Sequence, residues 1–139
     1  MEAYHGSWKI DIAQTKNMDE FLKAAGFPAE VAKEFVAREW SVTYGGDGSK
    51  VTVEVKVLNR PNLPVRNYVF EMGKEIEIEG VDGDKTLSTV SWDGGKFLET
   101  HKASNGAFEF NMTREAKGDK MFIVSKIKDT TLEEVYVRC

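Results

Sequence analysis

The feature that most constrains this chain is a series of short segments in which apolar and polar residues alternate. The clearest is 51–57, where four valines alternate with Thr52, Glu54 and Lys56. Successive side chains of a strand point to opposite faces, so this alternation predicts strands with one buried face. Turn sequences rich in glycine, asparagine and aspartate separate most of the segments. The pattern predicts many short antiparallel strands.

Short strands joined by tight turns indicate an all-β, up-and-down sheet that closes on itself, because closure removes exposed strand edges. A barrel of ten strands is wider than the eight-stranded barrels that hold one small ligand, so we expect an internal cavity. The predicted strands are 6–12, 40–44, 51–57, 68–72, 76–78, 86–92, 96–102, 107–114, 120–128 and 131–138.

Helical periodicity occurs only in residues 17–38, which divide at Gly26. Asn17 and Glu20 have the spacing of an N-terminal capping box. Two helices of about ten residues are marginal alone in water, so we expect them to cover the barrel mouth as a lid. The residues predicted on their apolar faces are Met18, Phe21, Leu22, Ala25, Val31, Ala32, Phe35 and Val36.

Length and composition restrict the function. A chain of 139 residues predicts a single domain, 1–139. Its 19 basic and 23 acidic residues are interspersed, which argues against nucleic acid as a partner. Cys139 is the only cysteine, and no segment has the apolar length of a signal core or a membrane span, so we expect a cytoplasmic protein. Two histidines and one cysteine are too few for a metal site, and no cofactor is expected.

Several short motifs, in their order and spacing, carry a resemblance to a known family. Residues 6–10 read Gly-Ser-Trp-Lys-Ile, 73–75 read Gly-Lys-Glu, 92–96 read Trp-Asp-Gly-Gly-Lys, and Tyr136 lies in the last strand. The chain resembles the intracellular lipid-binding proteins, the family of fatty-acid-, bile-acid- and retinoid-binding proteins. The resemblance implies a ten-stranded β-barrel (a β-clam) with a helix-turn-helix lid between strands one and two. It also implies noncovalent transport of a lipid in the cavity and no enzyme activity.

Two positions depart from the family's pattern. Glu134 replaces the arginine of the family's terminal Arg-x-Tyr pair, and Met112 aligns with a second arginine inside the barrel. Arg114 lies two residues further along and is expected on the same face. A buried carboxylate needs charge-assisted hydrogen bonds, so we expect that a fatty acid is not held in the family's usual way.

The same alignment points Phe97, Glu99 and His101 inward, toward Glu134. A carboxylate beside an imidazole could perform general acid–base catalysis or bind a ligand hydroxyl. A hydrogen-bonded polar network around water is the more frequent arrangement of such groups. An enzyme that uses Glu99, His101 and Glu134 on a bound lipid is therefore the alternative to a carrier, although no nucleophile accompanies them. An extracellular lipocalin is a second alternative, which a signal peptide and disulfides would favour.

The predicted ligand-binding residues combine polar groups with an apolar lining, and many of them would be ordinary core in another fold. We expect a monomer whose partner is a hydrophobic small molecule (fatty acid, retinoid, bile acid or neutral lipid), with transient membrane contact through the lid. The predicted binding residues are Tyr136, Glu134, His101, Arg114, Met112, Phe110, Ser125, Ile123, Trp92, Phe70, Tyr68, Phe35, Val31 and Leu22.

Overall fold

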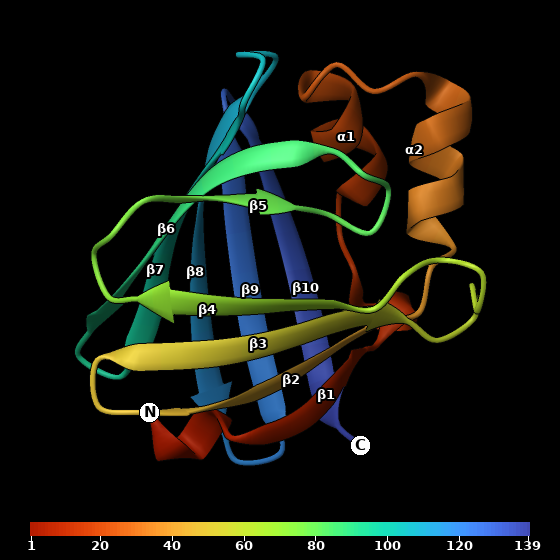
Figure 1. The fold of residues 1–139 in the computed structure, drawn as a ribbon. Coiled ribbons are helices and arrows are strands. Elements are labelled where there is room, and N and C mark those ends of the chain that lie inside the picture. Colours follow the sequence, from red (N-terminus) through yellow and green to blue (C-terminus); the bar gives the residue numbers. More distant parts are fainter.

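A computed structural model describes residues 1–139 as one antiparallel sheet curled into a barrel, with two helices across one end (Figure 1). The strand order is β4-β3-β2-β1-β10-β9-β8-β7-β6-β5. This order confirms the predicted up-and-down barrel with a helix pair between the first two strands. The strands are β1 (Gly6–Ile10), β2 (Trp40–Asp47), β3 (Lys50–Val57), β4 (Arg66–Glu71), β5 (Ile76–Glu79), β6 (Lys85–Asp93), β7 (Lys96–Ala103), β8 (Glu109–Lys117), β9 (Lys120–Ile127) and β10 (Thr130–Arg138).

The first strand is shorter than predicted. β1 ends at Ile10, and the chain then forms the 3-10 turn η2 (Ile12–Gln14). Pairing of β1 with β2 stops at Lys9, opposite Ser41. Ile12 therefore has no neighbouring strand on that side and is 38% exposed rather than part of the apolar face.

One neighbouring pair of strands lacks a backbone ladder. The ordered sheet begins at β4 and ends at β5, and no ladder joins these two edges. Side chains bridge the gap instead: Tyr68 Oη donates to the Glu79 carbonyl at 2.6 Å, and Arg66 Nε donates to the Gly80 carbonyl at 3.1 Å. Separating β4 from β5 therefore breaks fewer main-chain hydrogen bonds than separating any other neighbouring pair.

The lid consists of α1 (Met18–Ala24) and α2 (Ala29–Val36), which lie over the open end of the barrel (Figure 1). α1 packs on β9 and β10, whereas α2 packs mainly on α1. Their shared apolar cluster confirms the expectation that the helices cover the barrel with one apolar side. Its buried members are Phe21, Leu22, Ala25, Ala32, Ile127 and Leu132.

Two details of the predicted helices are wrong. Asn17 has a left-handed backbone (φ 69°), and its side chain donates to the Thr131 carbonyl at 3.1 Å, so it forms no capping box with Glu20. Val31 and Val36 are 38% and 37% exposed. α2 lies against α1 on one side only, and these two side chains fall outside that contact.

The other end of the barrel is closed by an N-terminal turn, η1 (Glu2–Tyr4). Tyr4 is 1% exposed, and its ring lies 4.7 Å from the Phe97 ring and 5.5 Å from the Trp92 ring. Trp8 Nε1 donates to the Tyr4 carbonyl at 2.9 Å. These aromatic side chains fill the closed end, so open space remains only between them and the lid.

Candidate ligand-binding site

Two adjoining hollows lie inside the barrel. The mouth hollow, about 300 Å³, lies beneath the lid and is lined by helix side chains such as Phe21 and Leu22 together with strand residues. The inner hollow, about 100 Å³, lies deeper, among Val51, Val53 and Phe97. The mouth hollow alone reaches the lower end of the size range of small-molecule sites, about 300 Å³. The residues common to both hollows are Val55, Tyr68, Ile78, His101 and Arg114.

Strand alternation sets which side chains reach these hollows. On β7, Phe97 and Glu99 are buried, whereas Leu98 between them is 37% exposed. His101 continues the inward face and lines both hollows. The structure therefore confirms that these three side chains point into the barrel.

A chain of polar contacts runs across β6, β7 and β8 at the side of the inner hollow. Ser88 Oγ lies 2.7 Å from His101 Nδ1, and His101 Nε2 lies 2.8 Å from Glu99 Oε1. Arg114 Nε donates to Glu99 Oε2 at 2.6 Å. Burial opposes ionisation of Glu99, but the Arg114 charge and the bond to His101 outweigh it and lower the pKa of Glu99 to about 2. Glu99 is thus an ionised carboxylate with both oxygens engaged.

Arg114 is the only arginine or lysine among the residues that line the two hollows. Burial disfavours its charge, yet the pKa of Arg114 is raised above its ordinary value, chiefly by Glu99. Its guanidinium also lies 6.0 Å from the centre of the Tyr44 ring. The one arginine or lysine that lines the hollows is therefore already paired.

Glu134 lies on the inward face of β10, and its surroundings differ from those of Glu99. It is 8% exposed, and neither a hydrogen bond nor an ion pair reaches its carboxyl group. Burial raises the pKa of Glu134 to about 7, against a smaller opposing effect of the Arg114 charge. The hydroxyl of Ser125, on the neighbouring strand β9, is also buried without a partner.

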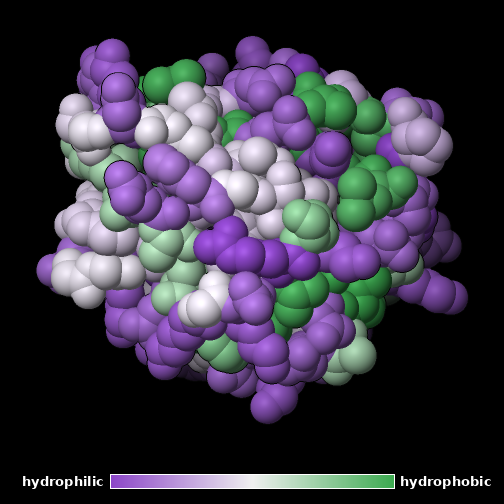
Figure 2. Space-filling model, turned by 90° about the horizontal axis from the view of Figure 1, so that it is seen from below, coloured by the Kyte–Doolittle hydropathy of each residue, from purple (hydrophilic) through white to green (hydrophobic).

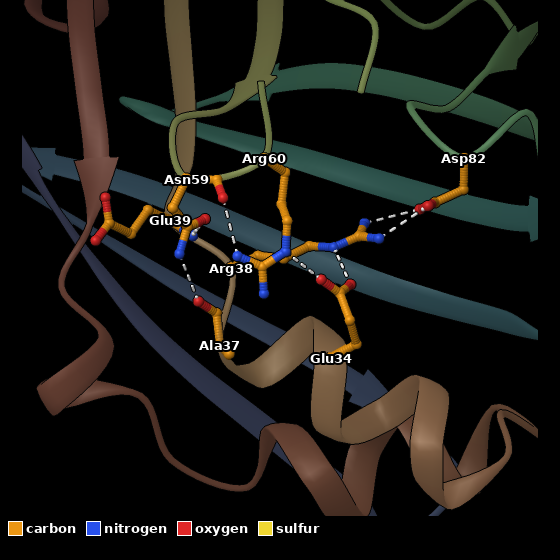
Figure 3. A network of polar contacts seen from close by, with 7 residues as sticks. All are labelled: Glu34, Ala37, Arg38, Glu39, Asn59, Arg60 and Asp82. Atoms are coloured by element: carbon orange, nitrogen blue, oxygen red, sulfur yellow. Dashed lines mark hydrogen bonds and ion pairs between the residues drawn. The ribbon is translucent and has the colours of Figure 1, made fainter. Parts of the chain in front are cut away.

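A second polar network lies at the edge of the lid (Figure 3). Arg38 Nη1 and Nη2 donate to the two carboxylate oxygens of Asp82 at 2.8 and 2.9 Å, and Arg38 Nε donates to Glu34 at 2.5 Å. Arg60 donates to the other oxygen of Glu34. Glu34 and Arg38 are four residues apart, a spacing typical of exposed helix ion pairs, but Arg38 is only 6% exposed. We call these four residues the portal latch, because they join α2 to the β5–β6 turn and the β3–β4 loop.

Asn59 adds two main-chain contacts to the same corner (Figure 3). Its side chain accepts from the Glu39 amide and donates to the Ala37 carbonyl, both at 2.9 Å. The end of α2 is thereby fixed to the β3–β4 loop. Three segments distant in sequence meet at this corner beside the mouth hollow.

Comparison with known proteins decides the family. A model described as the lipocalin / cytosolic fatty-acid binding protein family matches residues 2–139. The chain belongs to this family. It is 30% identical over 149 residues to cellular retinoic acid-binding protein 1 of Hippocampus comes, covering 99% of each chain. It is 29% identical over 140 residues to gastrotropin of Mus musculus, covering 95% of this chain and 96% of that protein.

The fold agrees with solved structures of the family. The Schistosoma mansoni fatty acid binding protein in complex with arachidonic acid superposes with a TM-score of 0.86 at 22% identity, covering 100% of this chain and 98% of that one. The family consists of lipid-binding carrier proteins rather than enzymes, which is consistent with binding of a hydrophobic small molecule by this chain. Neither helix has the length and apolar character that a membrane span requires.

The predicted ligand-binding residues of this family member fall into three groups. Trp92 packs against the Tyr4 plug and lines neither hollow, and Val31 borders a separate hollow between α2 and the 80–84 turn. Those buried on β9 and β10 without lining either hollow are Ile123, Ser125, Glu134 and Tyr136. Those that line a hollow are Leu22, Phe35, Tyr68, Phe70, His101, Phe110, Met112 and Arg114.

Several lining residues are missing from the predicted set. The alternation of 51–57 indicates one inward face, and Val51, Val53 and Val55 on that face do line the inner hollow. The alternation of 40–44 likewise places Tyr44 on the inward face of β2, where it lines the inner hollow. Val81 and Asp82, in the β5–β6 turn, carry no such signal, because only the folded barrel brings this turn beside the lid.

Proposed function

We propose that this protein is a noncovalent cytoplasmic carrier that holds a lipid in the two hollows beneath its lid. The observation that carries this proposal is the mouth hollow, most of whose lining is hydrophobic and which continues toward Arg114 and His101. Moving apolar ligand surface out of water supplies the driving force, on the order of 0.8 kcal/mol per buried methylene. The lining residues grouped above would bind the ligand.

Fatty acids, retinoids, bile acids and neutral lipids are the ligand classes that we consider. The names of the relatives support part of this range, since one binds retinoic acid and another structure contains arachidonic acid. Fatty acids and retinoids combine a long apolar body with one polar end. A cavity whose two hollows are mostly apolar, with one polar cluster of Glu99, His101 and Arg114 at its side, fits that shape.

The portal lies between α2, the 59–64 loop and the 80–84 turn, where the latch closes the edge of the lid. Transient membrane contact through the lid would suit ligand delivery, although Lys23 already pairs with Asp19 at 2.9 Å. On the face seen from below, hydrophobic residues form separate patches among hydrophilic ones (Figure 2). Proteins that assemble stably present larger continuous apolar patches, so this face is consistent with a monomer.

Native mass spectrometry of the protein purified from a cell extract tests the carrier function. We expect one or two small-molecule adducts that are lost on denaturation, and binding of the uncharged dye Nile red after delipidation. Val55→Trp, which fills the region shared by the two hollows, should weaken dye binding at least tenfold. Val69→Trp, on the outer face of β4 where Val69 is 56% exposed, is the matched control and should not. Absence of both adducts and dye binding in the folded wild type would contradict the proposal.

A further inference from the structure

The charges inside the barrel restrict the head group that it can take. Arg114 is held by Glu99 at 2.6 Å, and the other oxygen of Glu99 is held by His101. No second lysine or arginine lines either hollow. A ligand carboxylate would therefore enter an interior whose single cation already has a carboxylate partner, and a buried anion without a cation is costly.

Glu134 adds a second carboxyl group to the same interior. Strand pairing places Arg114 opposite Ile123, and Ile123 opposite Glu134. With neighbouring strands about 4.8 Å apart, the backbones of Arg114 and Glu134 are about 10 Å apart on the same inward face. A ligand carboxylate in this region would be the third acid around one guanidinium. An uncharged head group adds no such charge.

Two buried polar groups here have no partner in the protein. The Glu134 carboxyl group is more than nine-tenths buried and receives no hydrogen bond, and Ser125 Oγ is fully buried and equally unpaired. Ser125 pairs with Leu132, which is the inward residue two positions before Glu134. Ser125 and Glu134 are therefore diagonal neighbours on adjacent strands. Buried polar groups are nearly always satisfied, so an unpaired acid and hydroxyl together mark a place for a ligand's polar atoms.

Building on the carrier function, we propose that the preferred ligand is a long-chain lipid with an uncharged, hydrogen-bonding head group, such as an alcohol or an ester of glycerol. Glu134 in its protonated form donates to the head-group oxygen, and Ser125 donates or accepts beside it. Arg114 stays paired with Glu99 and takes no part in holding the head. Glu134 and Ser125 line neither hollow, so the head group reaches them past Arg114, which lines both, and Glu134 is thus a specificity-determining residue beside the cavity.

Competition among four ligands with the same 18-carbon chain tests this selectivity. Oleyl alcohol, monoolein, oleate and oleylamine are each titrated against bound Nile red at pH 7. We expect oleyl alcohol and monoolein to displace the dye at concentrations no higher than oleate requires. A tenfold or greater preference for oleate would overturn the inference and leave the carrier function intact. A tenfold preference for oleylamine would overturn it too, because Glu134 would then be an anion.

Failure of all four ligands to displace the dye would overturn this inference, whereas the carrier function would still be decided by dye binding and retained adducts. Variants then separate the roles of the two carboxyl groups. Glu99→Gln releases Arg114 and should improve oleate binding about tenfold, with oleyl alcohol changed less than threefold. Unchanged oleate binding in this variant would show that Glu99 does not neutralise the arginine.

Glu134→Leu should weaken binding of oleyl alcohol and monoolein about tenfold, because the head-group oxygen loses its donor. Glu134→Gln, which keeps both shape and a donor, should stay within threefold of wild type and guards against loss through misfolding. Glu133→Leu, on the exposed face of the same strand, is the matched control and should change neither ligand. Equal binding by Glu134→Leu and wild type would overturn the role of Glu134.

Discussion

Glu99 and Glu134 are two carboxyl groups of one barrel interior with opposite protonation behaviour. Glu99 lies between Arg114 and His101, and these partners hold its pKa far below the ordinary value. Glu134 lies two strands away from Arg114 and two residues before Tyr136 on β10. It pairs with neither of them. Burial therefore dominates and raises its pKa to about 7. The difference comes from the partners that each carboxyl group has, since both residues are 8% exposed.

The raised pKa of Glu134 predicts how stability depends on pH. A glutamate in the unfolded chain titrates near about 4.3. The folded state binds the proton more tightly, so this group stabilises the fold fully below that pH, and its contribution is lost as pH rises through about 7. We expect the unfolding free energy of wild type to fall by about 2 kcal/mol more than that of Glu134→Gln between pH 5 and pH 8.

Urea unfolding at each pH measures this difference. Glu99 stays ionised throughout the range, and the remaining groups are the same in both proteins, so they cancel. Glu133→Gln, with its side chain on the exposed face, should follow the wild-type curve. Parallel curves for wild type and Glu134→Gln would show that Glu134 is ionised in the folded protein at both pH values.

At the scale of elements, the lid is attached to the barrel in two different ways. α1 is held by the apolar cluster that it forms with β9 and β10. α2 relies more on the portal latch, in which Arg38 pairs with Asp82 in the β5–β6 turn. Arg38 also lies over the Phe35 ring, 4.3 Å from its centre. An attachment by ion pairs at a partly exposed edge is easier to open than an apolar cluster.

Asp82→Asn should speed up ligand exchange by loosening α2. We expect both uptake and release of Nile red to accelerate about fivefold, corresponding to about 1 kcal/mol for a partly exposed ion pair, while the dissociation constant changes little. Stopped-flow fluorescence gives both rates. Asp93→Asn, exposed at the other end of β6 and outside any ion pair, is the matched control. Rates that are equal in wild type and Asp82→Asn would rule out the latch as a barrier to exchange.

At the scale of the whole molecule, the closed end and the lid end of the barrel differ in how many contacts must break when they open. The aromatic plug around Tyr4 is tightly packed, whereas the lid covers two hollows. The missing ladder between β4 and β5 reaches the lid end near the 80–84 turn. We therefore expect a ligand to reach the cavity through the lid end, where motion breaks the fewest contacts.

Hydrogen exchange with and without bound lipid tests this picture. Because the lid must open to admit a ligand, a bound lipid should slow amide exchange in α1, α2 and the 80–84 turn. Exchange in η1, at the closed end of the barrel, should change much less. Equal protection of the helices in the two states would count against a gating lid.

The sequence by itself determined the strands, the barrel class and the position of the lid. Alternation with period two is a local property, so it assigned Phe97, Glu99 and His101 to the inward face of one strand without any knowledge of their neighbours. The short motifs in order and spacing then pointed to the family. The same local rules misjudged Asn17 and the exposed Val31, because a cap or a covered face depends on what packs beside the helix.

Only the tertiary structure decided the polar chemistry of the interior. Arg114 and Glu99 become a pair because β7 and β8 are neighbours in a particular register, and Glu134 stays unpaired because Ile123 lies between it and Arg114. The Arg38–Asp82 contact joins residues that are 44 positions apart in the sequence. Periodicity assigns a side chain to one face of a strand. The arrangement of the neighbouring strands determines which group it pairs with, and that partner determines whether an acidic side chain is ionised.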